Sequence, residues 1–274
     1  MKNVAIASYS FHGLYNSKMI DVFSYLESVK FRYNMDTADI WNGMIPTLDD
    51  DFTDKIKIAL QQRDLTLVNL CVDGPHLWED NIETRKNNHE NALKYLKLAE
   101  KLNAKTIRID VGVQGKEMNE EQFEYVAKTY KEYAKIADSC GFKVGPENHW
   151  GASLNIKVME RLNAMVDSKA YGILLHYKPW EGDDNGTGNE VSAKFAMHTH
   201  LDATTCKGDI EPVIKMLIEK GYNGAFCVEH HTGKNEYNEV LGQLGVVKAA
   251  LGRLQDQGIT AGGFNPILRK SGLE

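Results

Sequence analysis

The sequence predicts a single-domain α/β protein with the (β/α)8 architecture of a TIM barrel, and three observations predict it. Short apolar runs alternate with longer amphipathic stretches at a period of roughly 30 residues. Glycine closes several helix-to-strand joints, as at Gly141 and Gly221. Polar residues gather where the later apolar runs end, and a barrel collects its functional residues at the carboxyl ends of its strands. An open doubly wound sheet would need a glycine-rich turn after the first strand, whereas residues 8–13 supply only Gly13.

The alternation predicts eight strands and seven helices in chain order. The strands are expected near residues 3–8, 34–40, 65–71, 105–110, 142–147, 171–176, 194–200 and 224–229. The helices are expected near residues 17–29, 51–62, 82–102, 118–139, 154–166, 209–220 and 237–254. After the sixth strand we expect a long loop with at most a short turn. Residues 1–274 are thus predicted to form one barrel, with a short tail from about residue 256.

The composition is that of an ordinary globular protein, with 42% hydrophobic and 26% charged residues. The net charge is −6 and basic residues are scattered, which argues against nucleic acid as a partner. The first apolar run is too short for a signal segment or a membrane span, so we expect a cytoplasmic protein without a membrane partner. The cysteines form no CxxC pair and are interpreted as buried thiols in a reducing compartment. A homo-oligomer is one option that the sequence leaves open.

The last four predicted strands end in residue types that bind metals. Burying a carboxylate or an imidazole without a partner costs several kcal/mol, so a shared divalent cation is the simplest explanation. The predicted metal ligands are Glu147, His176, His200 and Glu229. His198 shares one strand face with His200, and we prefer His200 because it is nearer the end of the strand.

This donor set suits manganese, zinc or cobalt, with magnesium as a further option. Asp202 is a candidate to accept a hydrogen bond from a ligand histidine and so orient it. Isolated histidines at strand ends are often core residues bonded to backbone, and it is their repetition that favours a metal site. His230 and His231 are interpreted as loop residues without a role.

Catalysis is predicted to depend on Glu147 and Glu229, assisted by His149. Two carboxylates from separate strands can face a substrate from different sides, which paired proton transfer requires. All four tryptophans follow predicted strands, and aromatic faces pack against the C–H surfaces of sugars. The predicted substrate contacts are Trp41, His76, Trp78, Asp110, Trp150, Lys178 and His198. Asp39, Asp73 and Trp180 belong to the same predicted rim.

Several segments resemble a known family. They are Glu147-Asn148-His149-Trp150-Gly151, Gly208-Asp209-Ile210, and Gly221-Tyr222-Asn223-Gly224 leading to Val228-Glu229. They are similar to the sugar phosphate isomerase/epimerase-like proteins of the xylose isomerase-like TIM-barrel superfamily (AP endonuclease family 2 type), which also contains endonuclease IV. The resemblance covers most of the chain. It implies one divalent metal held by two glutamates, an acidic residue and a histidine, and Glu147 and Glu229 match the glutamates.

The chain departs from the family pattern at three places. His176 stands where the family has an aspartate on the sixth strand. On the seventh strand the family's His-x-Lys-Asp is one residue shorter here, which leaves the choice between His198 and His200 open. Pro179 and Trp180 replace a substrate-binding histidine. A variant reaction or a loss of activity is therefore an alternative to the family's usual chemistry.

The resemblance and the residues together predict a metal-dependent isomerase or epimerase of a ketose or polyol derivative, working by proton abstraction next to a carbonyl with a metal-stabilised enediolate. No arginine cluster or glycine-rich turn marks a phosphate site, so we expect a carbohydrate substrate without phosphate. The main alternative is a lyase or dehydratase of the keto-inositol type. An endonuclease IV-like repair enzyme would need a basic groove and more metals. A non-catalytic sugar-binding barrel is the remaining alternative.

Overall fold

The computed structural model describes residues 3–183 and 185–261, and it confirms the predicted barrel. Its strands are β1 (Val4–Ile6), β2 (Thr37–Trp41), β3 (Thr66–Val72), β4 (Thr106–Ile109), β5 (Lys143–Gly145), β6 (Ile173–His176), β7 (Ala196–Asp202) and β8 (Phe226–Glu229). They form two parallel sheets in the orders β1-β8-β7-β6 and β2-β3-β4-β5. Parallel bridges from Ala7 to Asp39 and from Val144 to Tyr171 join the sheets, which closes the ring.

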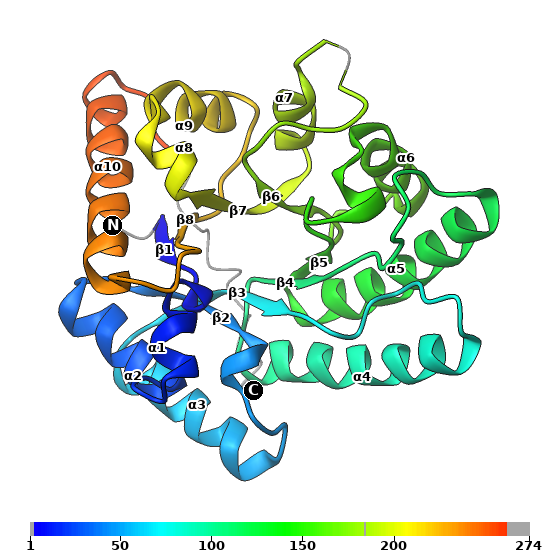
Figure 1. Ribbon diagram of the computed structural model, residues 1–274, viewed down its shortest axis with the longest axis horizontal. Coiled ribbons are helices and arrows are strands. Elements are labelled where there is room, and N and C mark those ends of the chain that lie inside the picture. The colour runs from blue at the N-terminus through cyan, green and yellow to red at the C-terminus, as the bar shows by residue number, and fades with distance from the viewer. Residues whose placement is uncertain (1–2, 184, 262–274) are drawn as a thin grey trace, which may run out of the picture.

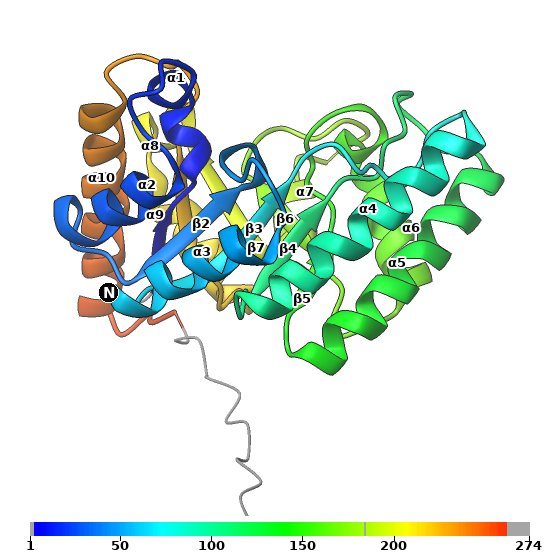
Figure 2. The ribbon, with the colours of Figure 1, turned by 90° about the horizontal axis from the view of Figure 1, so that it is seen from below.

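Helices surround this ring (Figure 1). The longer ones are α3 (Asp50–Gln62), α4 (Ile82–Lys101), α5 (Glu120–Cys140), α6 (Ile156–Val166), α9 (Ile210–Glu219) and α10 (Glu236–Asp256). The short ones are η1 (Ser8–Phe11), α1 (His12–Asn16), α2 (Val22–Glu27), η2 (Ser28–Arg32), η3 (Asn42–Met44), η4 (Gly151–Leu154), α7 (Gly188–Ala193) and α8 (Ala203–Lys207). Figure 2 shows the strands enclosed between α10 on one side and α4 to α6 on the other. No helix in the described ranges is long and apolar enough to cross a membrane.

The interior of the barrel is partly polar. Thr106 donates from its hydroxyl to Asn69, and the amide of Asn69 donates to Asp39. Asp39 in turn lies within hydrogen-bond distance of two histidines of β7, His198 and His200. Buried polar groups are tolerated only when they are paired. These bonds therefore let the barrel carry ionisable residues on strands that are otherwise apolar.

The first helical region differs from the prediction. In place of one helix at 17–29, the structure has α1, then α2, then the π-helical turn η2. Lys18 adopts a positive φ of 59°, which a helix cannot contain, and Asp21 begins α2 by accepting a hydrogen bond from the backbone of Ser24.

Two short helices also differ from the prediction. The long loop after β6 contains α7, and α8 follows β7 directly because Asp202 caps it. Both are too short for helical periodicity to reveal. The helix α10 ends at Asp256, where the tail is predicted to begin, and residues 262–274 of that tail lie outside the described residues.

Gly145 is expected to be indispensable for closing the barrel. A Cβ atom on Gly145 would lie 1.7 Å from the carbonyl oxygen of Gly172, a backbone atom that cannot move independently. We therefore expect Gly145→Ala to lower the free energy of unfolding by about 3 kcal/mol or more, measured by urea denaturation. Gly252→Ala is the control, since its Cβ meets nothing within 4 Å and alanine favours helix α10. Equal stability of the two variants would contradict this expectation.

Candidate functional site

Four predicted ligand residues meet at the carboxyl end of the barrel. Glu147 follows β5, His176 and Glu229 end β6 and β8, and His200 lies in β7. His176 Nδ1 is 3.1 Å from Glu147 Oε1 and 3.6 Å from Glu229 Oε2. His200 Nδ1 is 3.7 Å and 3.2 Å from the same two oxygens. All four side chains are buried, and their ligand atoms lie within 4.8 Å of one another. Each imidazole thus faces both carboxylates.

Hydrogen bonds between side chains and the backbone hold the four residues in place. Asn148 donates from Nδ2 to the carbonyl of His176, and the amide of His176 donates back to Asn148 Oδ1, at 2.8 and 2.7 Å. This reciprocal pair joins the ends of β5 and β6, which lie in different sheets and are linked by isolated bridges. The backbone amide of Glu147 donates to Asp110 Oδ1, which fixes the chain just before the carboxylate.

The buried carboxylates and imidazoles of the cluster shift each other's pKa values. Burial favours the neutral form of Glu147, but the hydrogen bond from His176 and the nearby charges of His200 and Arg108 hold its pKa well below the usual range. Burial likewise opposes the charged form of Glu229, and the charge of His200 keeps its pKa low. Burial alone would lower the pKa of His176, whereas Asp202, Glu147 and Glu229 raise it to about 9. Two buried carboxylates are therefore stabilised as anions by neighbouring positive charge.

The donor set and one orphaned atom fit a divalent metal. His200 Nε2 donates to Asp39 Oδ2 at 3.0 Å, which leaves Nδ1 to face the two glutamates. That Nδ1 atom is buried and has no hydrogen-bond partner of acceptable geometry among the described residues. A ligand histidine is commonly oriented in this way, with its second nitrogen on a carboxylate. Two carboxylates and two imidazoles are also the donors that manganese, zinc and cobalt accept.

The structure places His198 behind the cluster and not against a substrate, which corrects the prediction. Its side chain is fully buried, and Nε2 donates to Asp39 Oδ2 at 2.9 Å. Burial lowers the pKa of His198, so the imidazole stays neutral. Hydrogen bonds from His198 and His200 outweigh burial and lower the pKa of Asp39 to about 2. The sequence predicts Asp39 on the rim, whereas the structure shows it as a buried carboxylate that orients His200.

Arg108 is a further member of the site that is not among the predicted residues. It is 3% exposed, and its Nη1 lies 2.7 Å from Asp73 Oδ1 and 3.0 Å from Asp110 Oδ2. Its Nε lies 3.3 Å from Glu147 Oε2, on the side of that carboxylate away from the histidines. The signal in the sequence is an arginine inside the apolar strand Thr106–Ile109. Arg108 fixes Glu147 and compensates part of its charge.

A cavity of about 390 Å³ opens onto the cluster, and we call it the catalytic cavity. It is lined by Tyr9, Trp41, Cys71, Asp73, Arg108, Glu147, His149, His176, Lys178, Asp202, Glu229 and His231. The predicted Trp41, Lys178, His149 and Asp202 are among them. His149 is also held by Asp110, which lies 3.0 Å from its Nδ1.

His231 is a residue of this cavity to which the sequence assigns no role. Its Nε2 lies 2.9 Å from Glu229 Oε2, and its ring stacks on His176 at a centroid distance of 5.6 Å. Asp202 Oδ2 lies on the opposite edge of that ring from Glu147, 3.8 Å from His176 Nε2, a distance that is longer than the predicted hydrogen bond. The site therefore has more polar neighbours than the four predicted ligands.

Other predicted substrate contacts lie elsewhere. His76 and Trp150 pack edge to face on each other at 5.0 Å and do not line the catalytic cavity. Trp78 is 6% exposed and lies under the guanidinium of Arg85, against α4. Asp110 is buried and acts through Arg108 and His149 instead. Spacing alone places these residues on the correct rim but does not give the direction of their side chains.

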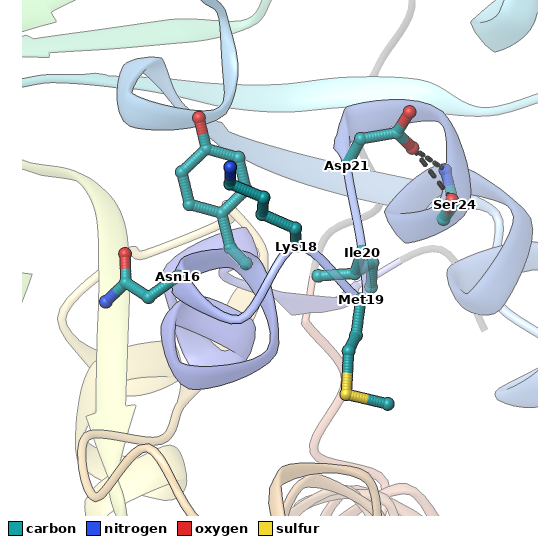
Figure 3. A pocket seen from close by; sticks show the side chains of 7 residues that line it. Asn16, Lys18, Met19, Ile20, Asp21 and Ser24 are labelled. Atoms are coloured by element: carbon teal, nitrogen blue, oxygen red, sulfur yellow. Dashed lines mark hydrogen bonds between the residues drawn. The ribbon is translucent and has the colours of Figure 1, made fainter.

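A separate hollow of about 510 Å³ lies over the segment between α1 and α2. Figure 3 shows its walls, with Lys18 and Met19 on the connecting loop and Asp21 bonded to Ser24. The Asp21 carboxylate serves to cap α2, and the hollow brings no group of metal-ligand residues together within the described ranges. This hollow is therefore a weaker candidate for an active site than the catalytic cavity.

Solved structures share this fold at low sequence identity. D-psicose 3-epimerase with D-tagatose from Clostridium cellulolyticum H10 is 17% identical, with a TM-score of 0.73 over 91% of this chain and 99% of that one. The probable 3-DHS dehydratase AsbF from Bacillus anthracis is 12% identical, with a TM-score of 0.70 over 90% and 98%. A magnesium complex of a xylose isomerase-like TIM barrel protein from Mycobacterium smegmatis is 13% identical, with a TM-score of 0.69 over 93% and 98%.

A search of curated proteins gave no match. The model of one family, however, matches residues 25–250, which is most of the chain and includes all four clustered residues, Glu147, His176, His200 and Glu229. That match agrees with the closed barrel and with the resemblance in the sequence. The chain belongs to the xylose isomerase-like TIM barrel family.

Proposed function

We propose that this chain is a metal-dependent isomerase or epimerase that acts on a ketose or polyol derivative by removing a proton next to a carbonyl group. The observation that carries the proposal is the convergence of Glu147, His176, His200 and Glu229 beside a cavity sized for a small molecule. Proteins of similar fold support it, since they include a D-psicose 3-epimerase.

The two glutamates and two histidines would hold one divalent ion, and manganese, zinc or cobalt fits their donors better than magnesium does. When bound, the ion withdraws electron density from the substrate carbonyl and stabilises the negative charge that follows proton removal. Asp39 keeps the Nδ1 lone pair of His200 directed toward the glutamates.

Proton transfer is assigned to the two glutamates. They come from β5 and β8, three strands apart around the barrel, and so reach a substrate from different directions. One carboxylate accepts the proton from carbon and the other returns one. Return of a proton to the opposite face of the same carbon inverts the configuration of that carbon. Transfer of the proton to the neighbouring carbon instead moves the carbonyl group. Arg108 and His231 hold one oxygen of Glu147 and Glu229, respectively.

Substrate positioning is assigned to the polar and aromatic rim of the catalytic cavity. Trp41 is fixed by a hydrogen bond of 2.6 Å from Nε1 to Asp73 and presents an aromatic wall. His149 and Lys178 offer hydrogen bonds to substrate hydroxyls, and burial lowers the pKa of Lys178. Arg108 is already engaged by carboxylates, so it is not available to bind a phosphate.

The test of this proposal starts from the metal. We expect elemental analysis of the purified protein to find one divalent ion per chain. Removing the ion with a chelator should lower the melting temperature, because an ion present at 100 times its Kd stabilises the fold by about 2.7 kcal/mol. Re-addition of manganese, zinc, cobalt and magnesium in turn identifies the metal that restores the stability.

A panel of ketoses and keto-inositols then tests the reaction, with products analysed by mass. A product of unchanged mass supports isomerisation or epimerisation. Loss of water or an alcohol would replace this proposal with a lyase, which begins with the same proton abstraction. Absence of both metal binding and turnover would reject the proposal.

A further inference from the structure

A second hollow lies beside the catalytic cavity and is larger, at about 780 Å³. We call it the outer cavity. Its walls come from the segment that follows β6 and from the region of α8 and α9, and they include Tyr177, Trp180, Asn189, Thr204 and Asp209. Lys178 and Asp202 line both cavities, so the two hollows meet at these residues.

The two carboxylate oxygens of Asp202 face different cavities. Its Oδ1 accepts hydrogen bonds from the backbone amide and the hydroxyl of Thr205 on the α8 side, at 2.7 and 2.8 Å. Its Oδ2 faces His176 of the catalytic cluster at 3.8 Å. Lys178 likewise donates to the carbonyl of His149 at 3.4 Å while its own carbonyl accepts from Asn189 at 3.1 Å. Asp202 and Lys178 therefore stand at the boundary that a ligand occupying both cavities would span.

Hydrogen bonds fix parts of the walls of the outer cavity. Trp180 donates from Nε1 to Asn189 Oδ1 at 2.9 Å, and its indole is 8% exposed. The hydroxyl of Thr205 also lies 3.2 Å from the carbonyl of Tyr177, which ties α8 to the segment after β6. The first bond fixes the wall formed by the segment after β6, and the second connects that wall to α8.

The chemistry of the lining suits a neutral, hydroxylated ring. Aromatic side chains stand beside amide, hydroxyl and carboxylate groups, a combination that packs against C–H surfaces and bonds hydroxyls. The described lining residues include three aspartates, Asp183, Asp202 and Asp209, against one lysine, Lys178. A phosphate or carboxylate group in this cavity would be repelled by the aspartates.

We infer that the substrate has two parts: a ketose ring that reacts beside Glu147 and Glu229, and a neutral second sugar ring, joined to it by a glycosidic bond, that occupies the outer cavity. The identity of the reacting ring rests on the proposed function. The outer cavity then determines specificity, because a lone monosaccharide leaves it filled with water and gains none of its contacts.

The experiment compares fructose with lactulose and palatinose, two disaccharides that contain fructose with its carbonyl carbon and the neighbouring C3 hydroxyl unsubstituted by the second sugar. Binding is measured by calorimetry and by the fluorescence of tryptophan, which Trp180 contributes from the outer cavity. Thr204→Trp places a bulky side chain at an exposed wall position of α8. Lys207→Trp is the matched control, an exposed position of the same helix that does not line the outer cavity.

We expect the wild-type protein and Lys207→Trp to bind at least one of the disaccharides about tenfold more tightly than fructose. Thr204→Trp should lose that advantage and keep the wild-type affinity for fructose. Equal affinity for all three sugars in the wild type, or an equal loss for fructose and disaccharide in Thr204→Trp, would overturn the inference. Turnover and metal content are measured on the same samples. A binding preference without turnover would reject the proposed reaction and leave the outer cavity assigned.

Discussion

Glu147→Gln is expected to abolish stoichiometric metal binding and to lower kcat/KM by roughly 10²–10⁴-fold, the range over which a positioned acid or base contributes. The change keeps the size of the side chain but removes a charge that faces His176 and His200 on one side and Arg108 on the other. Glutamine offers one neutral oxygen ligand and cannot accept a proton from carbon. Elemental analysis and steady-state kinetics on the preferred ketose measure the two effects separately.

The control for this prediction is Glu120→Gln, which removes a carboxylate paired with an arginine at the exposed start of α5. We expect it to retain both metal and activity, since exposed ion pairs contribute little. Glu229→Gln should behave like Glu147→Gln, because Glu229 faces the same two histidines. If Glu147→Gln kept both full metal content and full turnover, the assignment of the site would be wrong.

The barrel could be predicted from the sequence because its determinants are local and repeated. Apolar runs such as Ile173 to Leu175 and the amphipathic stretch at 82–102 identify strands and helices without knowledge of their neighbours. The same argument fails between residues 12 and 32, where a positive φ at Lys18 and the cap at Asp21 divide the helical region. It also fails for α7 and α8, since five or six residues contain too few turns to show a period.

The four clustered ligand residues could be predicted because a barrel brings the ends of its strands together, whatever the details of packing. The supporting residues could not. Asp39 and Arg108 act from the middle of strands, and only the structure shows that they point into the barrel toward His200 and Glu147. A charged residue inside an apolar strand is a visible signal, but the pairing of Asp39 with residues 159 and 161 positions away is not.

His176 changes the electrostatics that the family resemblance implies. An imidazole replaces an expected carboxylate, so the cluster carries two acidic ligands and two histidines. Asp202, at the end of β7, returns one negative charge at a distance of 3.8 Å from the far nitrogen of His176. A site with more nitrogen and less oxygen favours zinc, cobalt or manganese over magnesium. Under the proposed function, His176 therefore changes which metal the cluster prefers while still supplying a ligand atom.

Asp39→Asn is expected to weaken metal binding by 10- to 100-fold, the usual effect of replacing a carboxylate that orients a ligand histidine. Asp39 Oδ2 lies within 3.0 Å of both His198 Nε2 and His200 Nε2, and Cys227 Sγ is 3.4 Å away. An asparagine has a single oxygen acceptor and turns two donor hydrogens toward groups that must themselves donate. In the wild type, Asp39 fixes the tautomer of His200 that carries its proton on Nε2. The substitution would remove that preference.

Metal affinity is measured by competition with a chromogenic chelator. Two comparisons distinguish a specific loss of metal affinity from a general loss of stability. Asp138→Asn, at a surface carboxylate that pairs with Lys169, should leave affinity unchanged. Saturating metal should restore most of the turnover of Asp39→Asn, because the two glutamates proposed to transfer protons stay in place, whereas it should not restore Glu147→Gln. An Asp39→Asn protein that binds metal as tightly as the wild type would show that His200 is oriented by other contacts. Unrestored turnover at full occupancy would instead assign Asp39 a role beyond holding the ligand.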